Sequence, residues 1–207
     1  MGLSTYAELC AAVADWLERS DLSPRCADFV ALAESRLNRV LRPRALEREV
    51  VIRVEAGARA SRLGLPADFR EALGLWRDGP AGRQALRYVD PARLPVTPLP
   101  GVPRFWCLDA TGLRFERPVD AASCYALHML GRLALSDQAP TNPVLTDYPD
   151  LYLFGALVEA APYLRDADLL SLYAARFEAA LGEALVKEGR GKALARLTVE
   201  PGLTRGG

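Results

Sequence analysis

The sequence predicts a mainly helical α+β fold: a helical bundle of about four main helices, a small antiparallel β region in the middle and an extended C-terminal tail. Two observations predict it. Apolar residues recur at helical spacing in both terminal thirds of the chain, whereas they alternate with charged residues in parts of the middle third. We therefore expect a single domain over residues 1–188 and a separate tail over residues 189–207.

Residues 5–42 are predicted to form a helical hairpin. Thr5 and Glu8 have the spacing of a capping box, in which each side chain bonds a backbone amide in the first turn of a helix. Apolar residues then follow at intervals of three and four in two runs. Pro43 ends the second of these helices, because a proline cannot continue the backbone hydrogen bonding.

Strands are predicted in residues 48–131. Apolar and charged side chains alternate over residues 50–54, and residues 105–115 hold two apolar runs around a turn that ends at Gly112. Five prolines fall within residues 91–103, a density that excludes a helix or a central strand. This proline-rich loop has two interpretations of equal standing, a docking arm and a spacer.

The C-terminal helices are predicted over residues 149–188. Pro149 suits a first helical position, where its missing amide donor has no partner to lose. The first helix is apolar on almost every side apart from Glu159, which is typical of a helix buried on several faces. Gly189 suits the position just past the end of the second helix, and a mildly basic tail follows it.

The composition excludes several classes of protein. The 26 basic and 26 acidic residues cancel, so the whole chain has no net field to attract nucleic acid or an anionic membrane. No apolar run approaches the roughly 20 residues that span a bilayer, and the N-terminus lacks the pattern of a signal peptide. The four cysteines form no CxxC pair, so we expect small buried hydrophobes in a protein made in a reducing cytoplasm.

No motif for catalysis, a cofactor or a metal is present in the sequence. His128 is the only histidine, which excludes sites that need two histidines. The segment 189–192 lacks both the first glycine and the final Ser or Thr of a phosphate-binding loop. An unrecognised hydrolase that uses His128 or Glu159 is a distant alternative, to be discarded if alanine at both positions changes no measured activity.

Three segments carry a recognisable pattern, residues 5–47, 65–76 and 135–181. Their motifs are Phe29-x-x-Leu32-Ala33-Glu34-x-Arg36-Leu37-Asn38-Arg39, then Leu65-Pro66-Ala67-Asp68-Phe69, and finally Thr141-Asn142 followed by Tyr148-Pro149-Asp150-Leu151-Tyr152-Leu153. Together the segments cover about half of the chain and resemble the head-to-tail adaptor, or connector, family of tailed bacteriophages and phage-like gene transfer agents. Pro143 departs from the family pattern, which has a bulky apolar residue at that place.

This resemblance implies a structural virion protein and not an enzyme. Adaptors of this family form a ring, here expected to be a dodecamer, that joins the portal to the tail. DNA passes through the bore of such a ring without sequence-specific contacts. The implied partners are other copies of the chain, the portal protein and a tail, stopper or nozzle protein, with no membrane. The implied location is the head–tail junction of a virion or phage-like particle.

The ring hypothesis names two sets of contact residues. The tail is expected to meet the portal through Arg190, Lys192, Arg196, Leu197 and Arg205. The C-terminal helices are expected to form the wall between subunits through Tyr152, Phe154, Glu159, Tyr173 and Phe177. The alternative is a helical DNA-binding module that acts outside a ring, with Arg36, Arg39 and Arg42 on its contact face.

Overall fold

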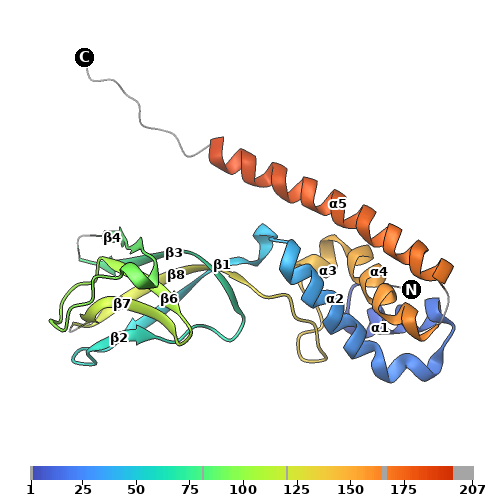
Figure 1. The fold of residues 1–207 in the computed structure, drawn as a ribbon, viewed down its shortest axis with the longest axis horizontal. Helices are drawn as coiled ribbons and strands as arrows, with labels where there is room; N and C mark the ends of the chain where they lie inside the picture. The colour runs from blue at the N-terminus through green and yellow to red at the C-terminus, as the bar shows by residue number, and fades with distance from the viewer. Residues whose placement is uncertain (1, 81, 120, 165–166, 198–207) are drawn as a thin grey trace, which may run out of the picture. The chain divides into compact units, whose positions relative to one another are not determined.

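The chain forms two compact units (Figure 1). Unit 1 combines the N-terminal part up to Arg44 with the C-terminal part from Leu133, and unit 2 is the continuous segment Ala45–Arg132. The single domain expected over residues 1–188 stays a prediction. The structure, a computed structural model, describes residues 2–80, 82–119, 121–164 and 167–197, with residues 20 and 191–197 as backbone only.

Unit 1 is helical. Its helices are α1 (Tyr6–Leu17), α2 (Cys26–Val40), α3 (Pro143–Asp147), α4 (Pro149–Ala160) and α5 (Ala167–Leu197). Both α1 and α2 lie within residues 5–42, where the helical hairpin is predicted. The predicted capping box is present, because Thr5 accepts from the Glu8 amide and Glu8 accepts from the Thr5 amide. Pro149 begins α4 as predicted. Pro143, the departure from the family pattern, takes the first position of α3, after the N-cap Asn142.

The core of unit 1 surrounds α4, which packs against α1, α2 and α5. Eight of the 12 residues of α4 are buried, as its apolar sequence predicts. Gly155 of α4 faces a residue of α2 and a residue of α5. A Cβ atom at this position would be 3.1 Å from Ala33 Cβ and 3.3 Å from Phe177 Cε2. The missing side chain therefore sets how closely these three helices pack.

The last helix is longer than predicted. α5 passes through Gly189 and continues to Leu197, so the predicted helix end at Gly189 and the extended conformation expected for residues 189–197 are wrong. One glycine costs a helix about 1 kcal/mol and does not by itself end it. The residues after Gly191 are mainly Ala, Leu, Lys and Arg, which are strong helix formers. Residues 198–207 of the expected tail lie outside the described residues.

Unit 2 contains two four-stranded sheets, with the orders β1-β8-β3-β4 and β2-β7-β6-β5. The strands are β1 (Glu47–Val54), β2 (Ala60–Leu63), β3 (Phe69–Gly79), β4 (Gly82–Ala85), β5 (Arg87–Tyr88), β6 (Phe105–Asp109), β7 (Gly112–Val119) and β8 (Ser123–Gly131). Only the β5–β6 pair is parallel among the described pairs. Apolar side chains of both sheets form one shared core, which includes Leu75, Trp106, Phe115, Tyr125 and Leu127.

Unit 2 corrects the predicted fold class. The chain has an α+β fold with two full sheets, and the prediction of a helical bundle with only a small β region is wrong. The longest strand, β3, gave no strand signal, because its register with β8 shifts between Phe69 and Glu71 and again between Ala72 and Gly74. Each shift interrupts the alternation by which a strand is recognised. The edge strand β4 is exposed throughout and carries no apolar alternation.

The other predicted strands are confirmed. β1 contains residues 50–54, and the predicted hairpin consists of β6 and β7, with Asp109 opposite Gly112. Gly112 has a φ of +127°, which is open only to glycine without strain. β1 and β8 pair along their whole length, so that Glu47 lies opposite Leu130. The chain therefore enters and leaves unit 2 on two neighbouring strands.

Candidate partner-binding surfaces

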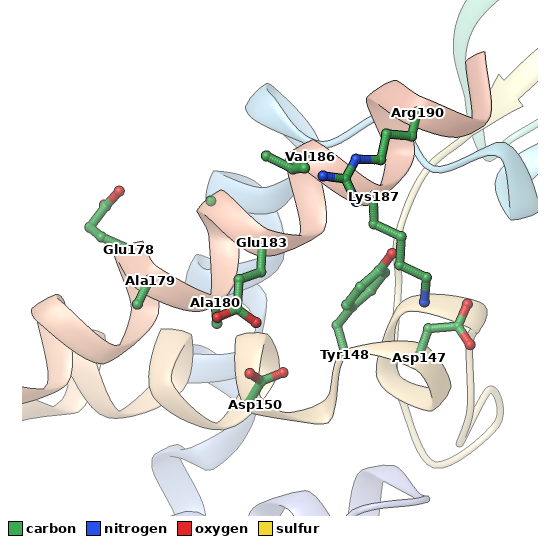
Figure 2. Close-up of a pocket in the computed structure, with 11 residues that line it drawn as sticks. Asp147, Tyr148, Asp150, Glu178, Ala179, Ala180, Glu183, Val186, Lys187 and Arg190 are labelled. Atoms are coloured by element: carbon green, nitrogen blue, oxygen red, sulfur yellow. The ribbon is translucent and has the colours of Figure 1, made fainter. Parts of the chain in front are cut away.

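An open groove lies between the start of α4 and one face of α5 (Figure 2). Its volume is about 900 Å³. Carboxylates line it on both sides, with Asp147 and Asp150 near the start of α4 and Glu178 and Glu183 on α5. Small apolar residues of α5 lie between them, and the cations Lys187 and Arg190 lie at the far end. The groove offers carboxylates and apolar contacts to a partner.

Tyr148 closes the basic end of this groove. The Lys187 Nζ lies 4.7 Å from the centre of the Tyr148 ring, and Figure 2 shows the lysine reaching across the ring towards Asp147. The Tyr148 hydroxyl donates to Glu188 Oε1 at 3.2 Å, and the Arg44 amide donates to Glu188 Oε2 at 3.1 Å. Burial, and then the Glu188 carboxylate, raise the pKa of Tyr148 to about 12. The phenol therefore stays protonated and acts as a hydrogen-bond donor.

The C-terminal part of α5 extends past its packing partner. α4 has 12 residues and α5 has 31, which correspond to lengths of about 18 and 46 Å. Ala184 is the last buried residue in the part of α5 whose side chains are described. Leu185, Val186 and Arg190 are exposed beyond it. This end of α5 presents apolar and basic side chains that the core of unit 1 does not cover.

The structure places four of the five residues expected to meet the portal on one helix, α5. Arg190 is exposed at the end of the groove. Lys192 and Arg196 are one helical turn apart in α5, although their side chains and that of Leu197 are not described. Arg205 lies outside the described residues. The contact of these residues with a portal stays a prediction.

The residues expected between subunits all contact their own chain. Tyr152, Tyr173 and Phe177 are buried inside unit 1. Phe154 is half-buried and packs edge-on against Trp16, with ring centres 5.6 Å apart. Glu159 pairs with Arg36 at 3.0 Å. These contacts hold the subunit together, and an additional contact with a neighbouring subunit stays a prediction.

A buried polar network in unit 1 was not predicted from the sequence. Glu34 is only 8% exposed, and its Oε1 accepts from the Tyr152 hydroxyl at 3.0 Å. That hydroxyl in turn accepts from Asn142 Nδ2 at 2.6 Å. Burial raises the pKa of Glu34 to about 7, although hydrogen bonds from Tyr152 and the Leu135 amide lower it. The sequence does contain a signal for the burial of Glu34. This residue lies beside Ala33 and three residues before Leu37, both of which belong to the apolar stripe of α2.

Asn38, one turn after Glu34, fixes the segment that returns to unit 1. Its Nδ2 donates to the Leu133 carbonyl at 3.1 Å, and its Oδ1 accepts from the Leu133 amide at 2.9 Å. The side chain thus satisfies both backbone groups of a buried residue. Two polar residues of α2, Glu34 and Asn38, therefore position the chain between β8 and α3.

Replacing Asn38 by alanine is expected to lower the free energy of unfolding by about 1–2 kcal/mol, because two half-buried hydrogen bonds to Leu133 are lost. Urea unfolding followed by circular dichroism measures the change. The matched control is Leu32→Ala, at an exposed position of the same helix, with an expected change within about 0.5 kcal/mol. Equal stability of the two variants would contradict the role assigned to Asn38.

Two arginines of α2 that the DNA-binding alternative places on its contact face, Arg36 and Arg39, contact other residues of the same chain. Arg36 pairs with Glu159 and lies over the Phe177 ring, with its guanidinium carbon 5.4 Å from the ring centre. Arg39 donates to Ser35 Oγ at 3.0 Å. Because the Glu159 carboxylate neutralises Arg36, this face of α2 offers less positive charge to DNA than the sequence indicates.

Nothing in the described part of the chain resembles a metal centre, since no group of three or more His, Cys, Asp or Glu side chains is placed to hold an ion. His128 packs against Trp76, with ring centres 6.1 Å apart. Within the same described residues, no helix is both long and apolar enough to cross a membrane.

The comparison with protein families is decisive. The family model described as SU10 adaptor protein matches residues 4–200. The chain belongs to the SU10 adaptor protein family. This is a family of phage head-to-tail adaptors, so the predicted recognition is confirmed. No curated protein matches the chain.

Membership of the SU10 adaptor family supports a structural role in a phage particle. It implies association with other head or tail proteins and a location at the head–tail junction of the virion. It also suggests a role other than catalysis. The surfaces described above, in particular the exposed end of α5, are therefore candidates for contacts with other proteins of the particle.

Proposed function

We propose that this adaptor forms a ring, a dodecamer, that joins the portal to the tail of a phage or of a phage-like particle such as a gene transfer agent. DNA passes through the bore of the ring without sequence-specific contacts. One side of the ring contacts the portal, and the other contacts a tail, stopper or nozzle protein. The observation that carries the proposal is the end of α5, which extends past its packing partner with exposed apolar and basic residues.

The end of α5 suits a contact with a large partner for two reasons. A helix that is already formed loses little conformational entropy on binding. Its exposed Leu185 and Val186 provide apolar area, while Arg190 and the two basic residues that follow provide charge for acidic groups of the portal. We propose that residues 185–197 and the tail after them form the portal-binding surface.

Removing residues 190–207 is expected to abolish attachment to the portal and to leave the subunit folded, because Ala184 is the last described buried residue of α5. Co-sedimentation with portal rings of the same particle measures attachment, and thermal unfolding measures the fold. Unchanged attachment of a folded, truncated chain would refute the proposed surface.

A charge reversal tests the same surface without a deletion. Arg190→Glu is expected to weaken portal binding by about tenfold, since it removes an attraction and adds a repulsion. Arg176→Glu, at an exposed position earlier on α5, is the matched control and should bind the portal as the unmodified chain does. Equal loss in both variants would point to a general effect of charge and not to a contact at the end of α5.

A further inference from the structure

Two cysteines of unit 1 contact each other. Cys10 lies in the middle of α1, and Cys26 is the first residue of α2. The two helices are in contact, and a hydrogen bond joins the two thiol side chains. Both residues are free cysteines in the structure. Two sulfur atoms at hydrogen-bonding distance need only a small movement of their side chains to reach the geometry of a disulfide bond.

The Tyr6 hydroxyl contacts the same pair. Tyr6 precedes Cys10 by four residues, so both side chains lie on one face of α1. The hydroxyl donates a hydrogen bond to the Cys10 sulfur. Burial, and then Cys10, raise the pKa of Tyr6 to about 12, so that the phenol stays protonated and remains a donor. The Cys10 sulfur is therefore held by two hydrogen-bond donors, Tyr6 and Cys26.

The hydrogen bonds make the two thiols unequal. The bond with Cys26 lowers the pKa of Cys10, and the bond with Tyr6 lowers it further, although burial and the Asp137 carboxylate oppose them. The bond with Cys10, and then burial, raise the pKa of Cys26. Cys10 is therefore the thiol that loses its proton first, and Cys26 donates to the thiolate that remains. Since the thiolate is the nucleophile in exchange reactions, Cys10 is the reactive member of the pair.

Exposure assigns the same roles to the two thiols. Cys10 is half-buried, whereas Cys26 is only 3% exposed. A dissolved oxidant can therefore reach Cys10, and Cys26, which is hydrogen-bonded to it, is in the place of a resolving thiol. The other two cysteines lie in unit 2, with Cys107 buried in β6 and Cys124 half-buried in β8.

The surroundings of a phage protein change during its life. Thiols stay reduced in the cytoplasm in which phage proteins are made, whereas disulfides form and persist at the surface of a released virion. Membership of the SU10 adaptor family implies a place in such a particle. The pair of Cys10 and Cys26 is therefore made as two thiols and later meets oxidising conditions.

We infer that Cys10 and Cys26 form a disulfide bond in the released particle, which fixes α1 to the start of α2. The inference goes beyond the proposed function and does not depend on a ring or on a portal contact. The bond closes a loop of about 15 residues, and a disulfide stabilises a fold chiefly by restricting the unfolded chain. The subunit is therefore expected to be more stable after release than it is in the host cell.

The reaction is a two-step thiol–disulfide exchange in which a small disulfide is the oxidant. The Cys10 thiolate attacks one sulfur of the oxidant, whose S–S bond breaks, and the small thiolate that leaves takes up the proton that Cys10 released. The charge of Cys10, which helps to raise the pKa of Cys26, is absent in this mixed disulfide. Cys26 then gives its proton to solvent and its sulfur attacks Cys10, while the second small thiolate leaves and takes up a proton. Two cysteine thiols are thereby oxidised by two electrons, and the oxidant is reduced to two thiols.

Oxidised glutathione is the probe, applied to the folded and reduced full chain. The parent chain carries Cys124→Ser, which removes the other half-buried thiol. Trypsin cuts after Arg19 and Arg25, so Cys10 and Cys26 fall on different peptides, and mass spectrometry without reduction detects a bond between them. We expect the linked peptides from the parent chain, with no glutathione retained. In Cys26→Ser, Cys10 should retain one glutathione, whereas Cys26 should stay unmodified in Cys10→Ser because it is buried.

Thermal unfolding measures the effect of the bond and verifies that each variant is folded. Oxidation is expected to raise the Tm of the parent chain by about 6–12 °C, the usual effect of closing a loop of this length, and dithiothreitol should reverse the rise. Cys10→Ser is the matched control and should keep its Tm under the same treatment.

Each outcome decides the inference. It is overturned if the parent chain takes up no glutathione, or if it retains glutathione on Cys10 without a link to Cys26. It is also overturned if the bond forms only in the unfolded chain, because the two thiols are then not held together by the fold. A linked chain that unfolds at the same temperature as the reduced chain would refute the stabilising role of the bond.

Discussion

Replacing Phe177 by alanine is expected to lower the free energy of unfolding of the chain by about 3–5 kcal/mol, the usual cost of removing a buried aromatic ring. Phe177 is fully buried where α5 meets α2 and α4. Its ring lies against the surface left open by Gly155 and beneath the Arg36 guanidinium. The loss would therefore leave a cavity between three helices and remove a cation–π contact.

Urea unfolding of the purified chain measures this effect, and Leu172→Ala provides the control on the same helix. Leu172 is exposed, so its truncation should change stability by no more than about 0.5 kcal/mol. The experiment also separates the two roles considered for Phe177. A Phe177→Ala subunit that keeps its stability but fails to assemble would mean that this ring acts between subunits and not inside one.

The second large effect concerns the pH dependence of stability. The pKa of Glu34 is about 7 in the folded chain, above its ordinary value of 4.5, so the folded state keeps a proton that the unfolded state releases. The stability supplied by the neutral carboxyl is fully present below about pH 4.5 and is lost as the pH rises through about 7. At about 1.4 kcal/mol per pKa unit the change amounts to about 3 kcal/mol.

A glutamine at position 34 keeps a neutral acceptor for the Tyr152 hydroxyl at every pH. We therefore expect the stability of the unmodified chain to fall relative to that of Glu34→Gln between about pH 4.5 and pH 7, by about 3 kcal/mol. Chemical unfolding at a series of pH values measures both profiles. Glu178→Gln, which changes an exposed carboxylate of α5, should follow the unmodified chain. Parallel profiles for the unmodified chain and Glu34→Gln would contradict the assignment.

The helical unit could be predicted largely from the sequence, and the β unit only in part. α1, α2 and α4 have a regular apolar stripe or an almost entirely apolar sequence, and the starts of α1 and α4 carry clear signals. In unit 2, apolar and polar residues alternate in the sequence where a strand has one buried face and a regular register. This alternation is interrupted in β3, whose register with β8 shifts twice, and it is absent from β4, whose residues are all exposed.

The candidate surfaces were harder to predict, because they depend on pairs of residues that are far apart in the chain. The sequence indicated that Glu159 would need a partner if buried, but not that the partner is Arg36. It also left the proline-rich loop as either an arm or a spacer. Its hydrogen bonds to Glu116 and Pro118 depend on how β7 lies in the sheet, which local composition does not specify. The end of α5 was missed because a glycine was given too much weight as a helix terminator.

The pairing of β1 with β8 has a consequence for how this architecture can vary. Because Glu47 lies opposite Leu130, the first and last strands of unit 2 are neighbours and its two ends lie close together. A module with adjacent ends can be exchanged, lengthened or trimmed while the host into which it is inserted keeps its packing. The helices can thus stay under selection for one set of contacts while the inserted sheets diversify to suit another. Two halves of one polypeptide are in this way free to evolve at different rates.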